Sequence, residues 1–279
     1  MVREKVWFIT GTGRGMGKII VKAALNAGHK VVATGRNTDA VAKAIGDSEN
    51  ALVVKLDVTR PDDAQSAVKA AIDRFGTIDV LVNNAAQFYG GFFEELTPVQ
   101  IDEQLHVSLI GPMNVTRAVL PVMRKQRTGH IVSISSGAGI SGFEFNSAYS
   151  ASKFALEGWM ESLSPEIAPF GIHTTIVNPG FFRTEFLTES SSTYAKNLLE
   201  DYEDRRASFL SFFKEQNGQQ SGDPTKLANA ILKIVSEIDP PKRFIGGADA
   251  MGIAEQKIVD LQAQVNAYRE LSSAMAYED

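Results

Sequence analysis

Two residues with complementary acid–base chemistry, Tyr149 and Lys153, lie four positions apart within a stretch of helical periodicity. Residues at that spacing share one face of a helix. A free tyrosine hydroxyl has a pKa of about 10, and a neighbouring ammonium lowers that pKa by stabilising the phenolate. The pair therefore predicts a tyrosine that gives and takes a proton near neutral pH.

A serine at the end of a Val- and Ile-rich run, Ser136, precedes Tyr149 by thirteen residues. At the end of a strand, such a hydroxyl is placed to hydrogen-bond a substrate oxygen, although serine is also an ordinary residue with which to begin a turn. Tyr202 and Arg206 form a comparable pair, but no serine stands at the same offset before Tyr202. We therefore expect chemistry at the first pair and not at the second.

A glycine-rich segment follows the first apolar run and leads directly into a helical stretch. Strand, glycine turn and helix in this order lay backbone N–H groups against a pyrophosphate, whereas glycines alone indicate only a tight turn. The spacing is T-G-x-x-x-G-x-G. We expect the segment to bind a dinucleotide through Gly11, Thr12, Gly13, Arg14, Gly15, Met16 and Gly17.

The end of the second apolar run bears on the choice of cofactor. Gly35 stands where a carboxylate would hold a free ribose 2′-hydroxyl, and Arg36 follows it. Arg14 adds a second cation from the glycine segment. Two guanidinium groups at one point favour a 2′-phosphate. We therefore expect NADP(H), with NAD(H) as the alternative.

Short apolar runs alternate with helical stretches along the chain, and these elements must position the residues above. The runs span residues 6–9, 30–33, 51–56, 79–82, 130–134, 173–177 and 242–245, and the helical stretches 17–26, 39–45, 62–75, 98–124, 147–169 and 223–238. Runs without polar alternation are typical of strands buried on both faces. The alternation predicts a single Rossmann-type α/β domain over residues 1–279, a doubly wound parallel sheet in the order 3-2-1-4-5-6-7 with helices on both faces.

Two segments lie outside this alternation. Residues 181–221, after the sixth strand, are aromatic and mixed in charge, with no clear strand. Because ligands bind beyond the carboxyl ends of parallel strands, we expect this insertion to form a small helical cover over the substrate. Residues 251–279 are expected to form a surface helix with a polar tail.

Four further motifs follow in order, and with them the sequence resembles the short-chain dehydrogenase/reductase family over most of its length. They are Asp57 after the third strand, Asn83-Asn84-Ala85-Ala86 after the fourth, Gly111 with Leu120-Pro121 in the long helix, and Pro179-Gly180 with Thr184 after the sixth.

The resemblance implies hydride transfer between a nicotinamide and a substrate carbonyl, with Tyr149 transferring the proton. Ser136 would orient the substrate oxygen, and Lys153 would bind the nicotinamide ribose. The family commonly pairs two long helices between subunits, which implies a homo-oligomer, either a dimer or a tetramer. Beyond the glycine segment, the implied cofactor contacts are Arg36, Asp57, Val58, Asn84, Ala85, Ala86, Tyr149, Lys153, Pro179, Gly180, Phe182 and Thr184.

One departure from the family concerns Ser108, three residues before Gly111. The family often has an asparagine there, which supports a water-linked proton path to the lysine. A serine hydroxyl can still bind water, and a backbone carbonyl could serve in its place. We expect Ser108 to belong to the catalytic group with retained activity.

Ten aromatic residues fall on predicted loops at the carboxyl ends of the strands. They are Phe88, Tyr89, Phe92, Phe93, Phe143, Phe145, Phe181, Phe182, Phe186 and Tyr194. Such residues either line a pocket for a bulky apolar or aryl ketone or pack the insertion against the body. We expect Phe143, Phe182 and Phe186 to join Ser136 and Tyr149 at the substrate.

Composition limits the remaining classes. A net charge of -5 over 279 residues argues against nucleic acid and anionic membranes as partners. The absence of cysteine excludes disulfides and thiolate metal sites, and the four histidines lack the spacing of metal ligands, so no metal is expected. With no signal-peptide core and no apolar run of about 18 residues, we expect a cytoplasmic protein.

The leading hypothesis is an NADP(H)-dependent carbonyl reductase that interconverts a small-molecule ketone or aldehyde and its alcohol, with bulky apolar or aryl ketones as the expected substrates. The first alternative is an NAD(H)-preferring alcohol or hydroxysteroid dehydrogenase. The second is a non-catalytic cofactor sensor on the same fold, a class that often loses the tyrosine or the lysine. A lyase on this scaffold would typically carry arginine in place of Lys153.

Overall fold

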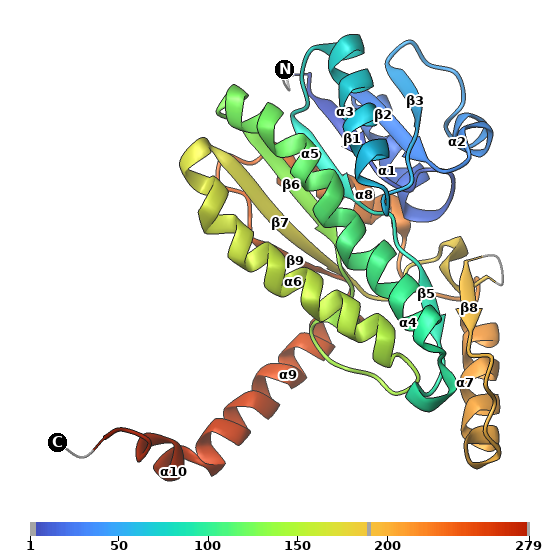
Figure 1. The fold of residues 1–279 in the computed structure, drawn as a ribbon, viewed down its shortest axis with the longest axis vertical. Coiled ribbons are helices and arrows are strands. Elements are labelled where there is room, and N and C mark those ends of the chain that lie inside the picture. The colour runs from blue at the N-terminus through green and yellow to red at the C-terminus, as the bar shows by residue number, and fades with distance from the viewer. Residues whose placement is uncertain (1–3, 189–190, 278–279) are drawn as a thin grey trace.

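Seven strands form one parallel sheet in the computed structural model of the chain, which describes residues 4–188 and 191–277 (Figure 1). The strand order is β3-β2-β1-β4-β6-β7-β9. This confirms the predicted α/β fold and the order 3-2-1-4-5-6-7, since β6, β7 and β9 are the fifth, sixth and seventh strands of that count. The strands are β1 (Val6–Ile9), β2 (Lys30–Gly35), β3 (Ala51–Lys55), β4 (Val80–Asn83), β6 (Gly129–Ile134), β7 (Ile172–Pro179) and β9 (Arg243–Gly246).

Helices cover both faces of the sheet. In β1, Trp7 and Ile9 enter one layer and Phe8 enters the other, and all three are fully buried. Successive side chains of a strand point to opposite faces, so a strand covered on both sides is apolar throughout. The layers are formed by α1 (Gly15–Asn26), α2 (Thr38–Ile45) and α8 (Pro224–Ser236) on one face, and by α3 (Pro61–Phe75), α5 (Gly111–Gln126) and α6 (Ser147–Ile167) on the other.

The helical stretch predicted over residues 98–124 is confirmed, but it is not α-helical throughout. α4 (Pro98–Leu105) and α5 are separated by a π-helical turn at His106–Ile110. Pro112, the second residue of α5, has no N–H to donate to the carbonyl of Ser108 four residues earlier. The widened turn thus falls where the sequence removes a helical hydrogen bond.

A small second sheet pairs a strand of the body with a strand of the insertion (Figure 1). β5 (Phe88–Gly90) pairs in parallel with β8 (Ser192–Tyr194), and α7 (Glu203–Gln216) follows along the chain. The expectation of no strand between 181 and 221 is therefore wrong at β8, because a three-residue strand carries too little periodicity to be recognised. Positions 189–190 of the expected insertion lie outside the described residues.

Long-range contacts fasten the insertion to the body. Arg206 of α7 pairs with the fully buried Glu95, which also accepts a hydrogen bond from the Leu199 N–H at 3.0 Å. Tyr202 stacks on Phe92, with ring centres 4.4 Å apart. The comparable pair of the sequence, Tyr202 and Arg206, therefore makes contacts that hold the insertion in place.

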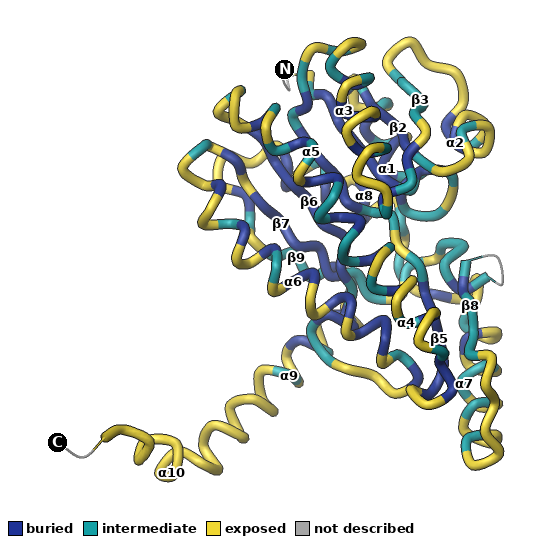
Figure 2. The backbone as a smooth tube through the Cα atoms, in the orientation of Figure 1, coloured by how far each residue is buried: buried dark blue, intermediate teal, exposed yellow. Residues whose placement is uncertain are grey.

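The C-terminal helix expected over residues 251–279 is present, but it projects from the body. α9 (Ala248–Ala267) and α10 (Arg269–Ser273) project away from the body, and most of their length is exposed (Figures 1 and 2). Within α9, Ala250 and Ala254 are the buried residues. Positions 278–279 of the expected tail lie outside the described residues. No helix in the described part of the chain is long and apolar enough to cross a membrane.

Candidate active site

The predicted functional residues converge on one cavity of about 950 Å³ at the carboxyl ends of the strands. This is where an open parallel sheet places its ligands. Of the predicted cofactor, catalytic and substrate residues, all but Thr12, Gly17 and Ser108 line the cavity. Within residues 4–188 and 191–277, no group of three or more metal-ligating side chains is placed to hold an ion.

Tyr149 and Ser136 meet inside this cavity. Tyr149 is the third residue of α6, is 8% exposed, and hydrogen-bonds to Ser136, which lies two residues beyond the end of β6. Burial raises the pKa of Tyr149 to about 12, and the bond with Ser136 opposes that effect. The Ser136 hydroxyl oxygen also accepts a hydrogen bond from the Ala138 N–H at 3.1 Å. Tyr149 is thus protonated at neutral pH and held beside a second hydroxyl.

Lys153 lies one helical turn after Tyr149 and is buried with it. Its Nζ donates to the carbonyl oxygen of Ile134 at 2.8 Å and lies 5.6 Å from the centre of the Tyr149 ring. Burial lowers the pKa of Lys153 to about 8, while the charge of Glu157 raises it. The predicted lowering of the tyrosine pKa is wrong for the protein alone, because burial of the phenol dominates and Ile134 engages the ammonium.

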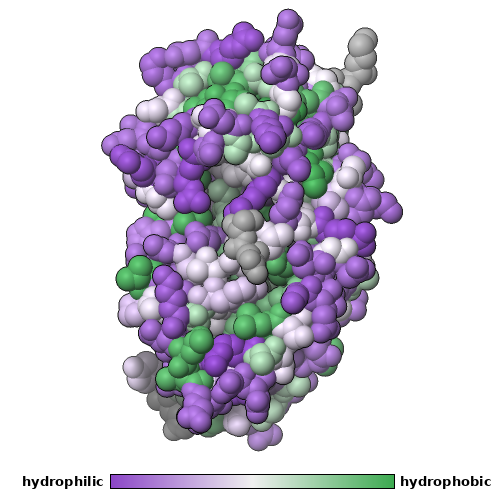
Figure 3. Space-filling model, turned by 90° about the vertical axis from the view of Figure 1, so that its right-hand side faces the viewer, coloured by the Kyte–Doolittle hydropathy of each residue, from purple (hydrophilic) through white to green (hydrophobic). Residues whose placement is uncertain are grey.

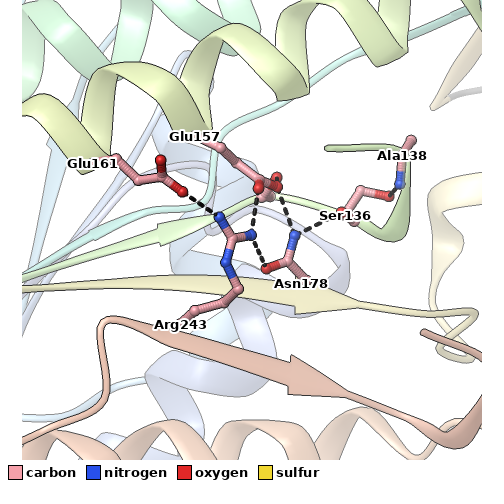
Figure 4. Close-up of polar contacts among 7 residues, drawn as sticks. Ser136, Ala138, Glu157, Glu161, Asn178 and Arg243 are labelled. Atoms are coloured by element: carbon pink, nitrogen blue, oxygen red, sulfur yellow. Dashed lines mark hydrogen bonds and ion pairs between the residues drawn. The ribbon is translucent and has the colours of Figure 1, made fainter. Parts of the chain in front are cut away.

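A buried charge network supports the strand end that carries Ser136 (Figure 4). Glu157 of α6 accepts hydrogen bonds from the Ser135 hydroxyl at 2.5 Å and from Asn178 Nδ2 at 2.6 Å. Asn178 Nδ2 also donates to the Ser136 carbonyl at 2.8 Å, and Arg243 of β9 pairs with Glu157. The network therefore joins α6, β6, β7 and β9 directly beneath the two hydroxyls.

Sequence reasoning missed this network, although two local signals existed. Glu157 lies four residues after Lys153, on the same helix face, and Asn178 immediately precedes Pro179. Packing against the network also explains the glycine at position 139, because a Cβ there would overlap the Glu157 carboxylate. Nothing local marked Arg243, which reaches the site only through the pairing of β9 with β7.

The glycine segment wraps closely around the start of α1. A Cβ at Gly11 would overlap Ala85, and a Cβ at Gly17 would overlap the carbonyl oxygen of Gly11. Thr12 is fully buried, and its hydroxyl donates to the Thr34 carbonyl at 3.1 Å. Thr12 and Gly17 therefore shape the turn from behind the cavity wall, as the approach of a backbone to a pyrophosphate requires.

The start of α1 already holds an anionic group. The Glu185 carboxylate accepts a hydrogen bond from the Gly15 N–H at 2.9 Å and lies 3.5 Å from Lys18 Nζ. Burial acts to raise the pKa of Glu185, but hydrogen bonds from backbone N–H groups and the charge of Lys18 leave it lowered. A helix N-terminus that holds a carboxylate also suits a phosphate oxygen. The residues present therefore fit a dinucleotide, and sequence reasoning missed Glu185.

The far end of the cavity carries the two arginines expected at the adenosine side. Arg14 and Arg36 are both exposed and both border the cavity. Asp57 borders it too, and its carboxylate accepts hydrogen bonds from the Thr59 N–H at 3.0 Å and the Thr59 hydroxyl at 2.7 Å. The cavity therefore presents cationic side chains at the end of β2 and a fixed carboxylate after β3.

The turn after β7 is held by the root of α9. A Cβ at Gly180 would overlap the side chain of Asp249, whose carboxylate accepts a hydrogen bond from the Phe181 N–H at 2.7 Å. Thr184, which also borders the cavity, caps the next turn by accepting from the Phe186 N–H at 3.3 Å. Asp249 lay outside the predicted site. To predict it, one would have had to know that α9 begins beside the turn after β7.

Comparison with known proteins decides the family. The family model described as short chain dehydrogenase matches residues 5–195. The chain belongs to the short-chain dehydrogenase family. It is accordingly an NAD(P)-dependent oxidoreductase with a small-molecule substrate.

Individual relatives agree over nearly the whole length. The chain is 36% identical to Oxidoreductase BOA17 of Botryotinia fuckeliana over 98% of this chain and 99% of that protein. It is 37% identical to a 3-ketodihydrosphingosine reductase of Bacteroides thetaiotaomicron over 87% of each chain. A crystal structure of a short-chain dehydrogenase from Streptomyces avermitilis matches with a TM-score of 0.89 and 34% identity, over 99% of this chain and 100% of that one.

The aromatic residues of this short-chain dehydrogenase divide into two groups. Five of the ten predicted aromatics line the cavity, namely Phe88, Phe143, Phe181, Phe182 and Phe186. Phe92 and Phe145 instead pack against each other and against Phe209. Sequence reasoning missed three lining residues of α7, namely Phe209, Phe212 and Phe213. Their i, i+3, i+4 spacing was the available signal.

The aromatic half of the cavity reaches Tyr149 directly. Phe88 lies edge-on to the Tyr149 ring at 5.3 Å, and Phe186 lies 5.9 Å from it, both measured between ring centres. Figure 3 faces the insertion, and hydrophobic side chains interrupt the hydrophilic surface over its lower half, where α7 and β8 lie. In this short-chain dehydrogenase, therefore, the candidate proton donor stands where a polar half and an aromatic half of one cavity meet.

Ser108 lies behind the cavity wall, in the π-helical turn, and is 1% exposed. Its hydroxyl accepts a hydrogen bond from Gln104 Nε2 at 2.9 Å. Gln104 Nε2 also contacts the Ser152 hydroxyl at 3.2 Å, and Ser152 donates to the Tyr149 carbonyl at 2.7 Å. The side chain expected to serve a proton path is thus engaged in a packed network, and Gln104 is a further residue that sequence reasoning missed.

Proposed function

We propose that the protein is an NADP(H)-dependent carbonyl reductase of bulky apolar or aryl ketones. The observation that carries the proposal is the position of Tyr149, which is hydrogen-bonded to Ser136 and in ring contact with Phe88 and Phe186. A ketone there has a hydrogen-bond donor pair for its oxygen and aromatic rings for its substituents.

The dinucleotide would lie along the strand ends. Its pyrophosphate would meet the glycine segment and the start of α1, and the turn from Pro179 to Thr184 would border its nicotinamide. When bound, the cofactor supplies the hydride. The Glu185 carboxylate accepts a hydrogen bond from the Gly15 N–H. When the cofactor enters, this carboxylate must either release the Gly15 N–H to a phosphate oxygen or remain beside the phosphates.

In the reducing direction Tyr149 donates its proton to the oxygen of the former carbonyl. Burial keeps the phenol protonated, with a pKa of about 12, and Ser136 orients the oxygen. Lys153, with a pKa lowered to about 8 by burial, carries its charge below that pH and stabilises the phenolate that forms. Reduction should therefore proceed best below about pH 8 and decline as the pH rises through the lysine pKa.

The path that returns a proton to Tyr149 would use the backbone carbonyl of Ser108. Pro112 removes the helical donor to that carbonyl, while the Ser108 hydroxyl is engaged by Gln104. Replacement of the family asparagine by serine then costs little, because the carbonyl does not depend on the side chain.

Arg14 and Arg36 support the preference for NADP(H). Both border the adenosine end of the cavity, and Gly35 leaves no carboxylate at the end of β2 to receive a free 2′-hydroxyl. NAD(H) remains the alternative cofactor. The relative named for 3-ketodihydrosphingosine supports ketone reduction, and the aromatic half supports a bulky substrate. We include a homo-oligomeric state in the proposal.

The test follows the absorbance of NADPH and NADH against aryl ketones, keto esters, steroids and sugars. We expect turnover with NADPH on bulky ketones. Arg36→Ala should reduce the NADPH-over-NADH preference by about tenfold or more, since one charged hydrogen bond contributes about 1.5–3 kcal/mol, while Arg117→Ala, on the exposed face of α5, should leave it unchanged. Equal use of NADH by the unaltered protein would refute the cofactor preference. Tight cofactor binding without turnover of any carbonyl would refute the reductase.

A further inference from the structure

The arm formed by α9 and α10 leaves the body with an apolar stripe exposed. Ala254 is the last buried residue of α9, and the helix projects away from the body (Figures 1 and 2). Ile258, Leu261, Val265 and Tyr268 are 67%, 48%, 55% and 65% exposed. The part of α9 beyond Ala254 is 13 residues long, and isolated helices of about 12–15 residues or fewer are marginally stable in water. The arm therefore needs a partner that covers the stripe.

The spacing of the stripe identifies the kind of partner. Met251, Ala254, Ile258, Leu261 and Val265 of α9 follow one another at alternating intervals of three and four residues, and Tyr268 continues the spacing at the residue that ends α9, where φ is -120° and ψ is 17°. That repeat is the seam along which two helices pack as a coiled coil. A helix with such a seam is self-complementary, since a two-fold axis brings the same stripe of a second copy onto it.

The exposed area agrees with an uncovered interface. The chain exposes 14900 Å², whereas a compact monomer of 30.3 kDa exposes about 11,800 Å². The difference of about 3,100 Å² exceeds the roughly 800 Å² per partner that a stable interface buries. The projecting arm is the feature that departs from a compact shape (Figure 1).

Charge selects the partner class. The seam is flanked by Glu255 and Lys257, a mixed pair rather than the Lys- and Arg-rich face that binds a lipid surface. Arg269 follows the break at Tyr268 and belongs to α10, so it does not continue the flank of the α9 seam.

We propose that the α9–α10 arm pairs with the same arm of a second copy of this chain, through the stripe formed by Ile258, Leu261 and Val265 of α9. This surface is separate from the long helices α5 and α6, the kind of helix that the family pairs between subunits. The first residues of α9 contribute Asp249 and Ile253 to the candidate active-site cavity. The pairing therefore anchors the helix that holds the turn after β7.

The first experiment measures molar mass by light scattering across a concentration series. We expect the unaltered protein to be oligomeric and Leu261→Glu to halve its mass. Val259→Glu is the matched control, because Val259 is 61% exposed on the same helix but lies off the stripe, and it should leave the mass unchanged. A monomeric unaltered protein, or an unchanged mass for Leu261→Glu, would overturn the proposal.

The second experiment uses the absence of cysteine to read the direction of pairing. Leu261 and Val265 both lie on the stripe within α9, about 6 Å apart along the axis. In a parallel pair in register, Leu261 of one copy faces Leu261 of the other, so the Leu261→Cys protein alone should form a disulfide-linked dimer under mild oxidation. In an antiparallel pair centred between these two residues, only a mixture of Leu261→Cys and Val265→Cys proteins should cross-link. No cross-linking of either protein alone or of the mixture would contradict pairing through the stripe.

Discussion

The two halves of the cavity are built in different ways. The polar half consists of strand ends and the glycine segment, positioned by a parallel ladder and by buried contacts such as the Asn178 amide on the Ser136 carbonyl. The aromatic half is assembled from β5, β8 and α7, joined across long stretches of chain by ring stacking and by pairs such as Arg206 with Glu95.

This difference separates chemistry from specificity. Tyr149 and Lys153 stand on a 21-residue helix packed against the sheet, which suits groups that must hold their geometry. The insertion contacts the body through few elements, and such regions open locally at low cost. Changes on the polar side should therefore act on turnover, and changes on the aromatic side should act on substrate affinity.

The largest effect should come from removing the Tyr149 hydroxyl, which lies at the boundary between the polar half and the aromatic half of the cavity. Tyr149→Phe keeps the ring that packs against Phe88 but deletes the proton donor. General acid catalysis contributes about 10²–10⁴-fold, so we expect kcat to fall by about 10³ while NADPH affinity measured by fluorescence changes little. Tyr202→Phe, in the comparable pair of the insertion, should retain full turnover. A Tyr149→Phe protein with kcat near that of the unaltered protein would remove the assignment of the donor.

The polar half could be predicted from local sequence. A strand buried on both faces must be continuously apolar, and the i, i+4 spacing of Tyr149 and Lys153 holds on any helix. The contacts that could not be predicted join distant positions. Arg243 and Glu157 are 86 residues apart, and Glu185 and Gly15 are 170 apart. Such contacts follow from strand order and from the path of the insertion, which no local pattern encodes.

The α7 residues of the aromatic half could not be predicted from sequence for a related reason. Phe209, Phe212 and Phe213 of α7 were not selected, because the side of α7 that faces the body is only partly apolar. Its non-exposed positions follow one stripe, but two of them are the polar residues Arg206 and Gln216, Phe212 lies outside the stripe, and only Phe213 is buried. Local periodicity identifies a helix that packs against a large core, and α7 packs mainly against a cluster of rings.

An intermediate effect should come from the aromatic half. Phe186→Ala removes a ring that lines the cavity and contacts Phe88 and Tyr149. An aromatic contact contributes about 0.5–1.5 kcal/mol beyond its buried area, so KM for an aryl ketone should rise by about tenfold with kcat nearly unchanged.

Phe92→Ala is the matched control for that change. Phe92 belongs to the same aromatic cluster but packs against Phe145 and Tyr202 away from the cavity. It should lower the melting temperature without altering KM for the ketone. If Phe186→Ala instead reduced kcat while KM stayed constant, the two halves would not divide chemistry from specificity as their construction implies.

The smallest effect tests whether the network beneath the polar half tunes the chemistry or only supports it. Burial lowers the pKa of Lys153 to about 8 and the charge of Glu157 raises it, so Glu157→Gln should lower the lysine pKa further. Because reduction requires the charged lysine, the alkaline limb of the kcat–pH profile should move to lower pH, by less than about one unit if the amide keeps the hydrogen bonds. Glu161→Gln also removes a partner of Arg243, at 2.8 Å, but from the exposed side, and should leave the limb in place. Equal profiles for both variants would limit Glu157 to holding Ser135 and Asn178, whereas a shift confined to Glu157→Gln would make it a positioning residue that sets the protonation of Lys153.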